Sequence, residues 1–210
     1  MCAITGSFNK EKLKELYKLN AYRGEMSYSL ATFTPSPLGG DLVSEMRLGV
    51  LMQNDGSMPE ELVDTVPLSE NGYLIAHSQA PTTDTKNIHP AVYGSTMLWH
   101  NGIIKQKTIP EETWDTQWLL EQIVYYGWSS LSRIDGTFAC IMYNNNEIYV
   151  FRNEISPLFY DDELNFSSTK FEGSKSLEPN KVFRVNFNYK QLSPVAFFET
   201  FENPYYIPEV

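Results

Sequence analysis

The sequence predicts an α+β domain built on largely antiparallel sheets that are covered by helices. Segments with the alternating pattern of strands occur in both halves of the chain, and two segments among them have helical spacing. Short turn-rich segments separate the last predicted strands, which is typical of antiparallel neighbours. The 210 residues are 42% hydrophobic and 20% charged, which suits one globular domain with a sizeable core.

The first half of the chain contains one predicted helix and several strands. KEKLKELYKLNAYRG (10–24) places Leu13, Leu16 and Tyr17 near helical spacing, and Gly24 is a plausible stop. TPSPLGGD (34–41) and TTDTKNIHP (82–90) are loops, because proline, glycine and small polar residues interrupt regular structure. The strands expected here are a short one in CAITGSF that ends at Gly6, SYSLATF (27–33), GYLIAHS (72–78) and STMLWHNGII (95–104).

The second half contains the clearest helix and a further run of strands. EETWDTQWLLEQIVYYG (111–127) repeats apolar residues near i, i+4, and Glu111 and Glu112 favour the N-terminal end of the helix dipole. The strands expected after it are TFACIMY (137–143), EIYVFRN (147–153), ELNFSS (163–168) and KVFRVNFN (181–188).

Charge and composition exclude several classes of protein. The formal net charge is −10 and no basic run occurs, which argues against binding nucleic acid or an anionic membrane surface. No stretch approaches the ~20 apolar residues of a membrane helix, and no basic segment followed by an apolar run marks a signal peptide. Two cysteines, Cys2 and Cys140, are too few for a disulfide scaffold and suit a reducing compartment. We therefore expect a soluble, cytoplasmic protein.

Cys2 is the first candidate for chemistry. A thiolate is a strong nucleophile, but a free cysteine is only slightly ionised at neutral pH and needs a base. If Met1 is removed, the α-amine of Cys2, with a reference pKa of about 7.7–8.0, can act as that base. Taken alone, Cys2 is a weak signal, and a second residue that has no role is the favoured interpretation.

The Asn101–Gly102 pair is the second candidate. A side-chain amide and a backbone N–H presented together can hold a developing oxyanion. Asn-Gly is also the strongest short turn signal, so a hairpin turn is the alternative. The remaining candidates also have ordinary explanations: Arg23 as an ion-pair partner, His77 as a core histidine and Asp115 as a helix cap.

Taken together and in order, these segments resemble the class II glutamine amidotransferases. The glutaminase domains of that family are N-terminal-nucleophile hydrolases, and they supply ammonia in asparagine synthetase, glucosamine-6-phosphate synthase and amidophosphoribosyltransferase. The resemblance spans about residues 2 to 170. The segments that carry it are MCAITGSF, YRGEMSYS, HSQAPT, LWHNGII, WDTQWLL, IDGTFACIMYN and FRNEISPLFYDDELNFSST. It implies a four-layer αββα sandwich of two mainly antiparallel sheets.

The resemblance also implies a role for each matching residue. Cys2 attacks the side-chain amide carbon of glutamine, and its own α-amine shuttles the proton. Asn101 and Gly102 resemble the oxyanion hole. Arg23 and Gly24 match an Arg-Gly pair beside the nucleophile. Asp115 and Thr82 are placed to contact the α-ammonium and α-carboxylate of the substrate.

Gln79 is the main departure from the family pattern. It stands where the family has the arginine that binds the substrate carboxylate. Arginine forms a bidentate, charge-assisted pair with a carboxylate, whereas glutamine offers a neutral donor. Losing that contact costs about 1.5–3 kcal/mol, or roughly tenfold to a hundredfold in affinity. Glutamine is then bound weakly, another arginine substitutes, or the substrate differs.

The function expected from the resemblance is a stand-alone glutaminase that releases glutamate and ammonia and passes the ammonia to an acceptor subunit in trans. We expect a single domain over residues 1–210, with a C-terminal tail from about 195 to 210, and no metal or organic cofactor. Two alternatives stay open: an amidase for a different amide, and an inactive homologue that serves as a binding or regulatory subunit.

Overall fold

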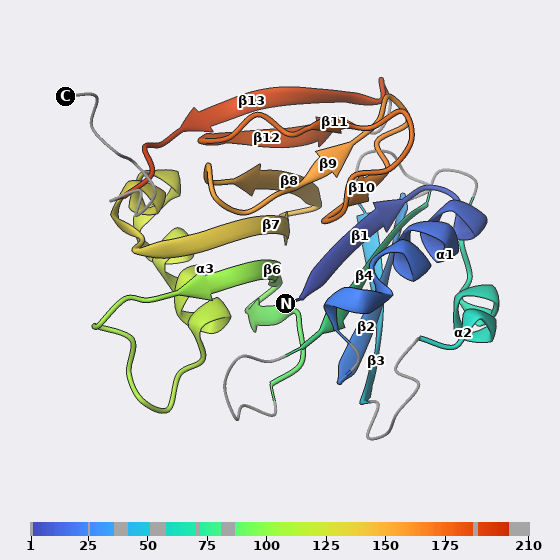
Figure 1. The fold of residues 1–210 in the computed structure, drawn as a ribbon, viewed down its shortest axis with the longest axis horizontal. Coiled ribbons are helices and arrows are strands. Elements are labelled where there is room, and N and C mark those ends of the chain that lie inside the picture. The colour runs from blue at the N-terminus through green and yellow to red at the C-terminus, as the bar shows by residue number, and fades with distance from the viewer. Residues whose placement is uncertain are drawn as a thin grey trace.

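The computed structural model describes residues 2–24, 26–35, 42–50, 58–69, 72–80, 87–186 and 189–201. Its strands form one seven-stranded and one six-stranded sheet (Figure 1). The larger sheet has the order β11-β9-β10-β1-β4-β2-β3. Its members are β1 (Ala3–Ser7), β2 (Ser27–Pro35), β3 (Leu42–Val50), β4 (Tyr73–Gln79), β9 (Phe159–Tyr160), β10 (Phe166–Ser167) and β11 (Lys175–Ser176).

The smaller sheet has the order β13-β12-β8-β7-β6-β5. Its members are β5 (Ala91–Tyr93), β6 (Thr96–Ile104), β7 (Gly136–Asn144), β8 (Glu147–Arg152), β12 (Lys181–Asn186) and β13 (Gln191–Phe197). All the described strand pairs in both sheets are antiparallel, as expected from the short connections in the sequence.

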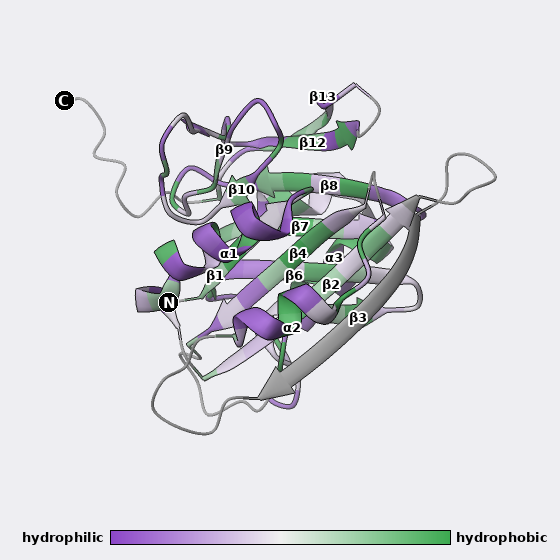
Figure 2. Cartoon of the chain, turned by 90° about the vertical axis from the view of Figure 1, so that its right-hand side faces the viewer, coloured by the Kyte–Doolittle hydropathy of each residue, from purple (hydrophilic) through white to green (hydrophobic). Residues whose placement is uncertain are grey.

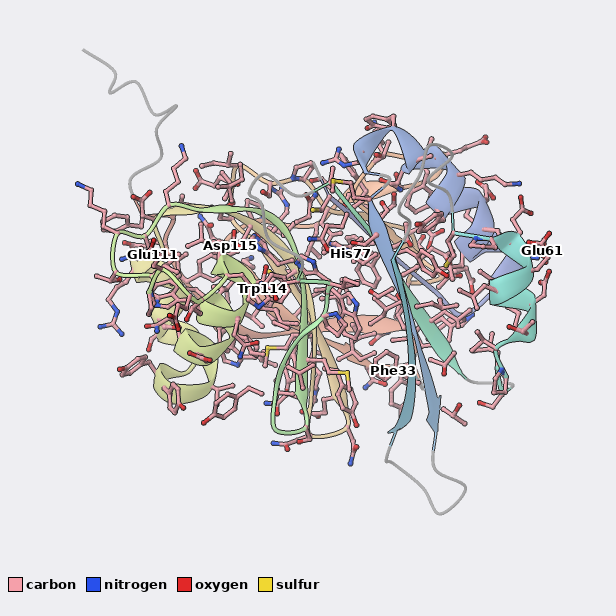
Figure 3. All side chains as sticks on the ribbon, turned by 90° about the horizontal axis from the view of Figure 1, so that it is seen from below. Phe33, Glu61, His77, Glu111, Trp114 and Asp115 are labelled. Atoms are coloured by element: carbon pink, nitrogen blue, oxygen red, sulfur yellow. The ribbon has the colours of Figure 1, made fainter. Side chains whose placement is uncertain are left out.

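The helices cover the outer faces of the two sheets. They are α1 (Lys10–Leu19), α2 (Glu60–Thr65) and α3 (Asp115–Tyr126), with the 3-10 turns η1 (Ala21–Arg23) and η2 (Trp128–Arg133). Figure 3 shows the order across the molecule: α3, the smaller sheet, the larger sheet, then α1 and α2. The four-layer αββα sandwich predicted from the sequence is therefore confirmed.

Three apolar clusters lie between these layers, because successive strand residues face opposite sides. Between the sheets, Ile4, Ile75 and Trp99 are fully buried. Alternate residues of the same strands face the helices: Leu74 packs with α1, and Leu98 packs with α3. The outward side of α1 is mostly hydrophilic (Figure 2).

Several local expectations from the sequence were wrong. The helix expected from residue 111 begins at Asp115, because the Thr113 N–H bonds to the Pro110 carbonyl in a turn and Trp114 is extended. The helix expected to reach Gly24 ends at Leu19, where the Asn20 side chain bonds to the Leu16 carbonyl.

The strand ELNFSS shortens to β10, because the Asp161 carboxylate accepts the backbone N–H groups of Glu163 and Asn165 in a turn. β3, α2, β5, β9, β11 and β13 were not expected from the sequence. Residues 195–197, placed at the start of the expected tail, belong to β13, and residues 202–210 lie outside the described part of the chain.

Candidate active site

Cys2 lies directly before β1, whose N-terminal end is next to β6 (Figure 1). The thiol is partly buried, and its Sγ is 3.8 Å from the Ala80 carbonyl oxygen. Burial raises the pKa of the Cys2 thiol above its ordinary value, and the negative charge of Asp115 raises it further, whereas the positive charge of Arg23 lowers it. The thiol is therefore protonated at neutral pH and depends on a base to attack.

Cys140 is fully buried beneath α3, where desolvation raises its pKa well above the ordinary value.

Arg23 and Gly24 bring the end of η1 against the nucleophile. The Arg23 Nε donates to the Cys2 carbonyl oxygen at 3.1 Å. Gly24 makes this approach feasible, since a Cβ on it would lie 2.5 Å from the carbonyl carbon of Gln79 at the end of β4. Arg23 therefore contacts Cys2 directly, and Gly24 packs against the end of β4.

Asn101 and Gly102 lie inside β6, where they pair with Ala139 and Phe138 of β7. The turn alternative for this Asn-Gly pair is therefore wrong. Gly102 has φ 153°, and a Cβ on it would be 1.9 Å from the Thr137 carbonyl oxygen. Only glycine adopts this backbone at this contact.

Three successive residues of β6 bond across to the larger sheet. The Trp99 Nε1 donates to the Ser29 Oγ at 3.3 Å. The His100 carbonyl oxygen is 3.3 Å from the His77 Nε2, and a carbonyl only accepts, so the proton is on that nitrogen. The Asn101 Nδ2 donates to the Ser168 Oγ at 3.2 Å, and the same oxygen accepts the Ile4 N–H at 2.9 Å. The Asn101 amide is thereby held against the first residues of β1.

Asp115 is the first residue of α3, and it is partly buried. Its Oδ1 accepts the Thr116 N–H at 2.7 Å, and its Oδ2 accepts the Ile104 N–H at 3.2 Å. These bonds fix a carboxylate near Cys2 at the end of β6, where it can attract a cationic group of a ligand. Figure 3 shows Asp115 and Trp114 on the α3 side and His77 between the sheets.

Gln79 is buried, and its amide is bonded within the protein at both ends. Its Oε1 accepts the Ser27 hydroxyl at 3.0 Å, and its Nε2 donates to the Asn87 carbonyl at 2.8 Å. These bonds hold the side chain among its neighbours. Thr82, the other residue expected near the carboxylate, lies outside the described residues.

All three histidines of the sequence gather under this site. The His77 and His89 rings stack with centroids 3.9 Å apart. The Thr116 Oγ1 lies 3.1 Å from the His89 Nε2 and 3.0 Å from the His100 Nδ1. All three are fully or nearly fully buried, and desolvation lowers their pKa values, that of His77 to about 3. They are therefore neutral hydrogen-bonding groups at pH 7, and His77 lies in the core.

Two kinds of site are absent from the described residues. Among them, no three His, Cys, Asp or Glu side chains are grouped so that they could hold a metal ion. No described helix is both long and apolar enough to pass through a bilayer.

No protein-family model and no curated protein matches the chain. Solved structures do match its fold. Glutamine phosphoribosylpyrophosphate amidotransferase from B. subtilis, complexed with ADP and GMP, aligns over 93% of this chain and 49% of its own, with a TM-score of 0.56 and 15% identity. A structure described as the allosteric regulatory enzyme of purine biosynthesis aligns over 96% and 50%, with a TM-score of 0.58 and 16% identity.

The fold is the N-terminal-nucleophile hydrolase sandwich. The chain spans about half the length of these two solved structures. The likeness to these two structures concerns the arrangement of sheets and helices. At 15% and 16% sequence identity it says nothing about individual side chains.

The structure brings most of the predicted site residues together around the start of β1. Arg23 contacts Cys2, Gly24 follows Arg23 directly in the chain, and Asn101 is joined to β1 through Ser168. Their catalytic roles stay predictions. Sequence reasoning missed Ser168, Thr116, His89 and His100. His100 precedes Asn101 directly, and Ser168 is the second-last residue of a segment that carries the family resemblance, so position alone could have drawn attention to both.

Proposed function

We propose that this chain is a glutaminase domain of the class II glutamine amidotransferase type. It hydrolyses the side-chain amide of glutamine to glutamate and ammonia. The observation that supports the proposal is the convergence of Cys2 and the Asn101 amide from different sheets. The Cys2 carbonyl is bonded to Arg23, and Ser168 joins the Asn101 amide to Ile4 two residues after Cys2.

The reaction follows from the chemistry of these groups. After removal of Met1, the Cys2 α-amine takes the thiol proton, and Sγ bonds to the amide carbon of the substrate. The Asn101 Nδ2 and the Gly102 N–H stabilise the oxyanion. The C–N bond breaks as the amine returns the proton to the departing ammonia. Water then hydrolyses the thioester, which restores the thiol and releases the carboxylate.

Substrate binding is assigned to the charged and polar groups around the thiol. Asp115 pairs with the α-ammonium of glutamine, and Thr82 contacts the α-carboxylate.

We further propose that the ammonia passes to a separate acceptor subunit in trans. We also propose that the protein acts in the cytoplasm, where Cys2 stays reduced. No metal or organic cofactor takes part in this scheme.

A Cys2→Ala variant tests the proposal. We expect glutamate and ammonia release to fall to background, with the variant folded as judged by circular dichroism. Intact mass should show that Met1 is absent and that a glutamine-like diazoketone labels the wild type once at Cys2. Undiminished release by Cys2→Ala, or a wild type that is neither labelled nor active, contradicts the proposal; the second result favours an inactive binding homologue.

A different amide substrate is the second candidate, and Gln79 favours it. Because the Gln79 amide bonds to Ser27 and Asn87, it does not replace a carboxylate-binding arginine. An amide without a free α-carboxylate suits such a site. Comparing kcat/KM for glutamine and for its α-carboxamide decides between them: a preference for the blocked compound selects the second candidate.

A further inference from the structure

The Ser168 hydroxyl is shared by the two sheets at the candidate site. It accepts the Ile4 N–H of β1 at 2.9 Å and the Asn101 Nδ2 of β6 at 3.2 Å. The backbone N–H of Ser168 also bonds to the Ile4 carbonyl at 3.0 Å. Ser168 is 1% exposed and Asn101 4%. Water therefore competes little with these bonds.

The hydrogen-bonding capacity of Ser168 is used entirely by the protein. A serine hydroxyl has one hydrogen and two lone pairs. The lone pairs accept from Ile4 and Asn101, and the hydrogen points to the Ile4 carbonyl at a long 3.5 Å. Ser168 therefore has no group left for a ligand, and it acts on the site through Asn101.

The bond to Ser168 determines where the Asn101 amide points. Its Nδ2 carries two hydrogens in one plane. One bonds to Ser168, and within the described part of the chain the other has no partner. Fixing the first hydrogen fixes the direction of the second, which is the one available to an oxyanion.

Ser168 itself is held by its neighbours in the chain. The Ser167 Oγ accepts the Asn20 Nδ2 at 2.8 Å, and the Thr169 Oγ1 donates to the Asn20 Oδ1 at 2.8 Å. Asn20 immediately precedes η1, which carries Arg23. The segment that presents Ser168 is thus tied to the turn that contacts Cys2.

We propose that Ser168 is a positioning residue that aligns the Asn101 amide with Cys2 by joining β6 to β1. The proposal rests on the function proposed above. The geometry of an oxyanion hole depends on the distance between nucleophile and donor, and these groups lie on different sheets. A hydroxyl that bonds to both strands at once fixes the distance between them.

Ser168→Ala is the direct test, with Ser29→Ala as the matched control. Ser29 is also a fully buried serine that accepts a bond across the sheets, from Trp99, two residues before Asn101. For Ser168→Ala we expect kcat to fall about 10- to 100-fold with KM changed less than about threefold, because a misplaced donor weakens the transition state more than binding. Ser29→Ala should lower stability and leave kcat within about threefold.

Asn101→Ala supplies the decisive comparison. If Ser168 acts through Asn101, the double variant should be no slower than Asn101→Ala within about threefold, since groups that act as a unit are not additive. Full additivity, or an equal loss of kcat in Ser29→Ala, overturns the proposal. If Ser168→Ala does not fold, Ser168→Cys keeps the volume and offers only a weak acceptor, and it should show the same pattern.

A measurement without turnover separates this proposal from the proposed function. The side-chain NH2 signals of Asn101, assigned by their loss in Asn101→Ala, should exchange with solvent at least about tenfold faster in Ser168→Ala, because a buried bond is lost. A wild type that cleaves no amide refutes the proposed function. Unchanged exchange in Ser168→Ala refutes the positioning role.

Discussion

Gly102 shows how one residue sets the geometry of the candidate oxyanion hole. Its φ of 153° and the approach of the Thr137 carbonyl leave no space for a side chain. A larger residue would push β6 away from β7 and turn the backbone N–H that follows Asn101. The glycine in this Asn-Gly pair is therefore required by the sheet.

Gly102→Ala should destabilise the protein strongly. We expect a loss of about 3–5 kcal/mol or failure to fold, because a buried clash and backbone strain combine. Gly94→Ala is the control, since Gly94 also has a positive φ, of 60°, with open space around it. It should cost only about 1–2 kcal/mol. Denaturant unfolding measures both, and equal losses would contradict the packing argument.

At the residue scale, the sequence indicated which side chains gather but not how they connect. The family resemblance identified Cys2, Arg23 and Asn101. Gln79 was expected to offer a donor to the substrate, whereas its amide bonds to Ser27 and Asn87. Hydrogen-bond partners far apart in the chain are set by packing, and local residue patterns do not contain them.

At the scale of elements, α3 begins where the charge of its first residue, Asp115, can act on the Cys2 thiol. Asp115 is held at the helix start by the backbone N–H groups of Thr116 and Ile104. Had the helix begun at residue 111 as the sequence suggested, Asp115 would lie in its second turn. The tertiary contact with Ile104 in β6 fixes the carboxylate at the end of that strand.

Asp115→Asn should lower the pKa of the Cys2 thiol. Burial is the main reason that this pKa is raised, but the Asp115 carboxylate adds to it, since a nearby negative charge disfavours the thiolate. The pH dependence of iodoacetamide alkylation should shift to lower pH. The same variant should raise KM for glutamine, because the proposed partner of the α-ammonium is lost.

Glu121→Gln, on the same helix, is the control for this effect. It removes the same charge in the second turn of α3, where Glu121 accepts a bond from Gln117. Its alkylation profile should match the wild type. An equal shift in both variants would mean that overall charge, and not the position of Asp115, acts on the thiol.

At the scale of the whole molecule, the three histidines link stability to pH. All are buried and neutral, with pKa values lowered below 6.5 by desolvation. As pH falls below about 6.5, the unfolded chain takes up protons that the folded chain does not. The free energy of unfolding should therefore decrease, by up to about 1.4 kcal/mol per pH unit for each histidine and about 4 for all three.

Denaturant unfolding between pH 7.5 and about 5 measures this slope above the range where carboxylates titrate. His77→Phe keeps a flat ring in the stack, and it should reduce the slope by about a third. An unchanged stability from pH 7.5 to 5 would mean that the histidines take up protons in the folded state.

The residue patterns by themselves determined an α+β class with antiparallel sheets and most strands, and the family resemblance added the αββα order and the candidate nucleophile. Strand alternation and short connections are local, so they can be read from residues such as those of β4, β6 and β7. The short strands β9 and β11 and the edge strand β13 carry little local pattern, and the sheets to which they pair define them.

Only the tertiary structure decided how the site is assembled. It placed Asn101–Gly102 inside a strand, enclosed the Gln79 amide, and joined β1 to β6 through Ser168. The physical reason is that a polar group buried between layers must bond to whatever the fold brings opposite it. That partner can be 164 residues away, as Ser168 is from Ile4.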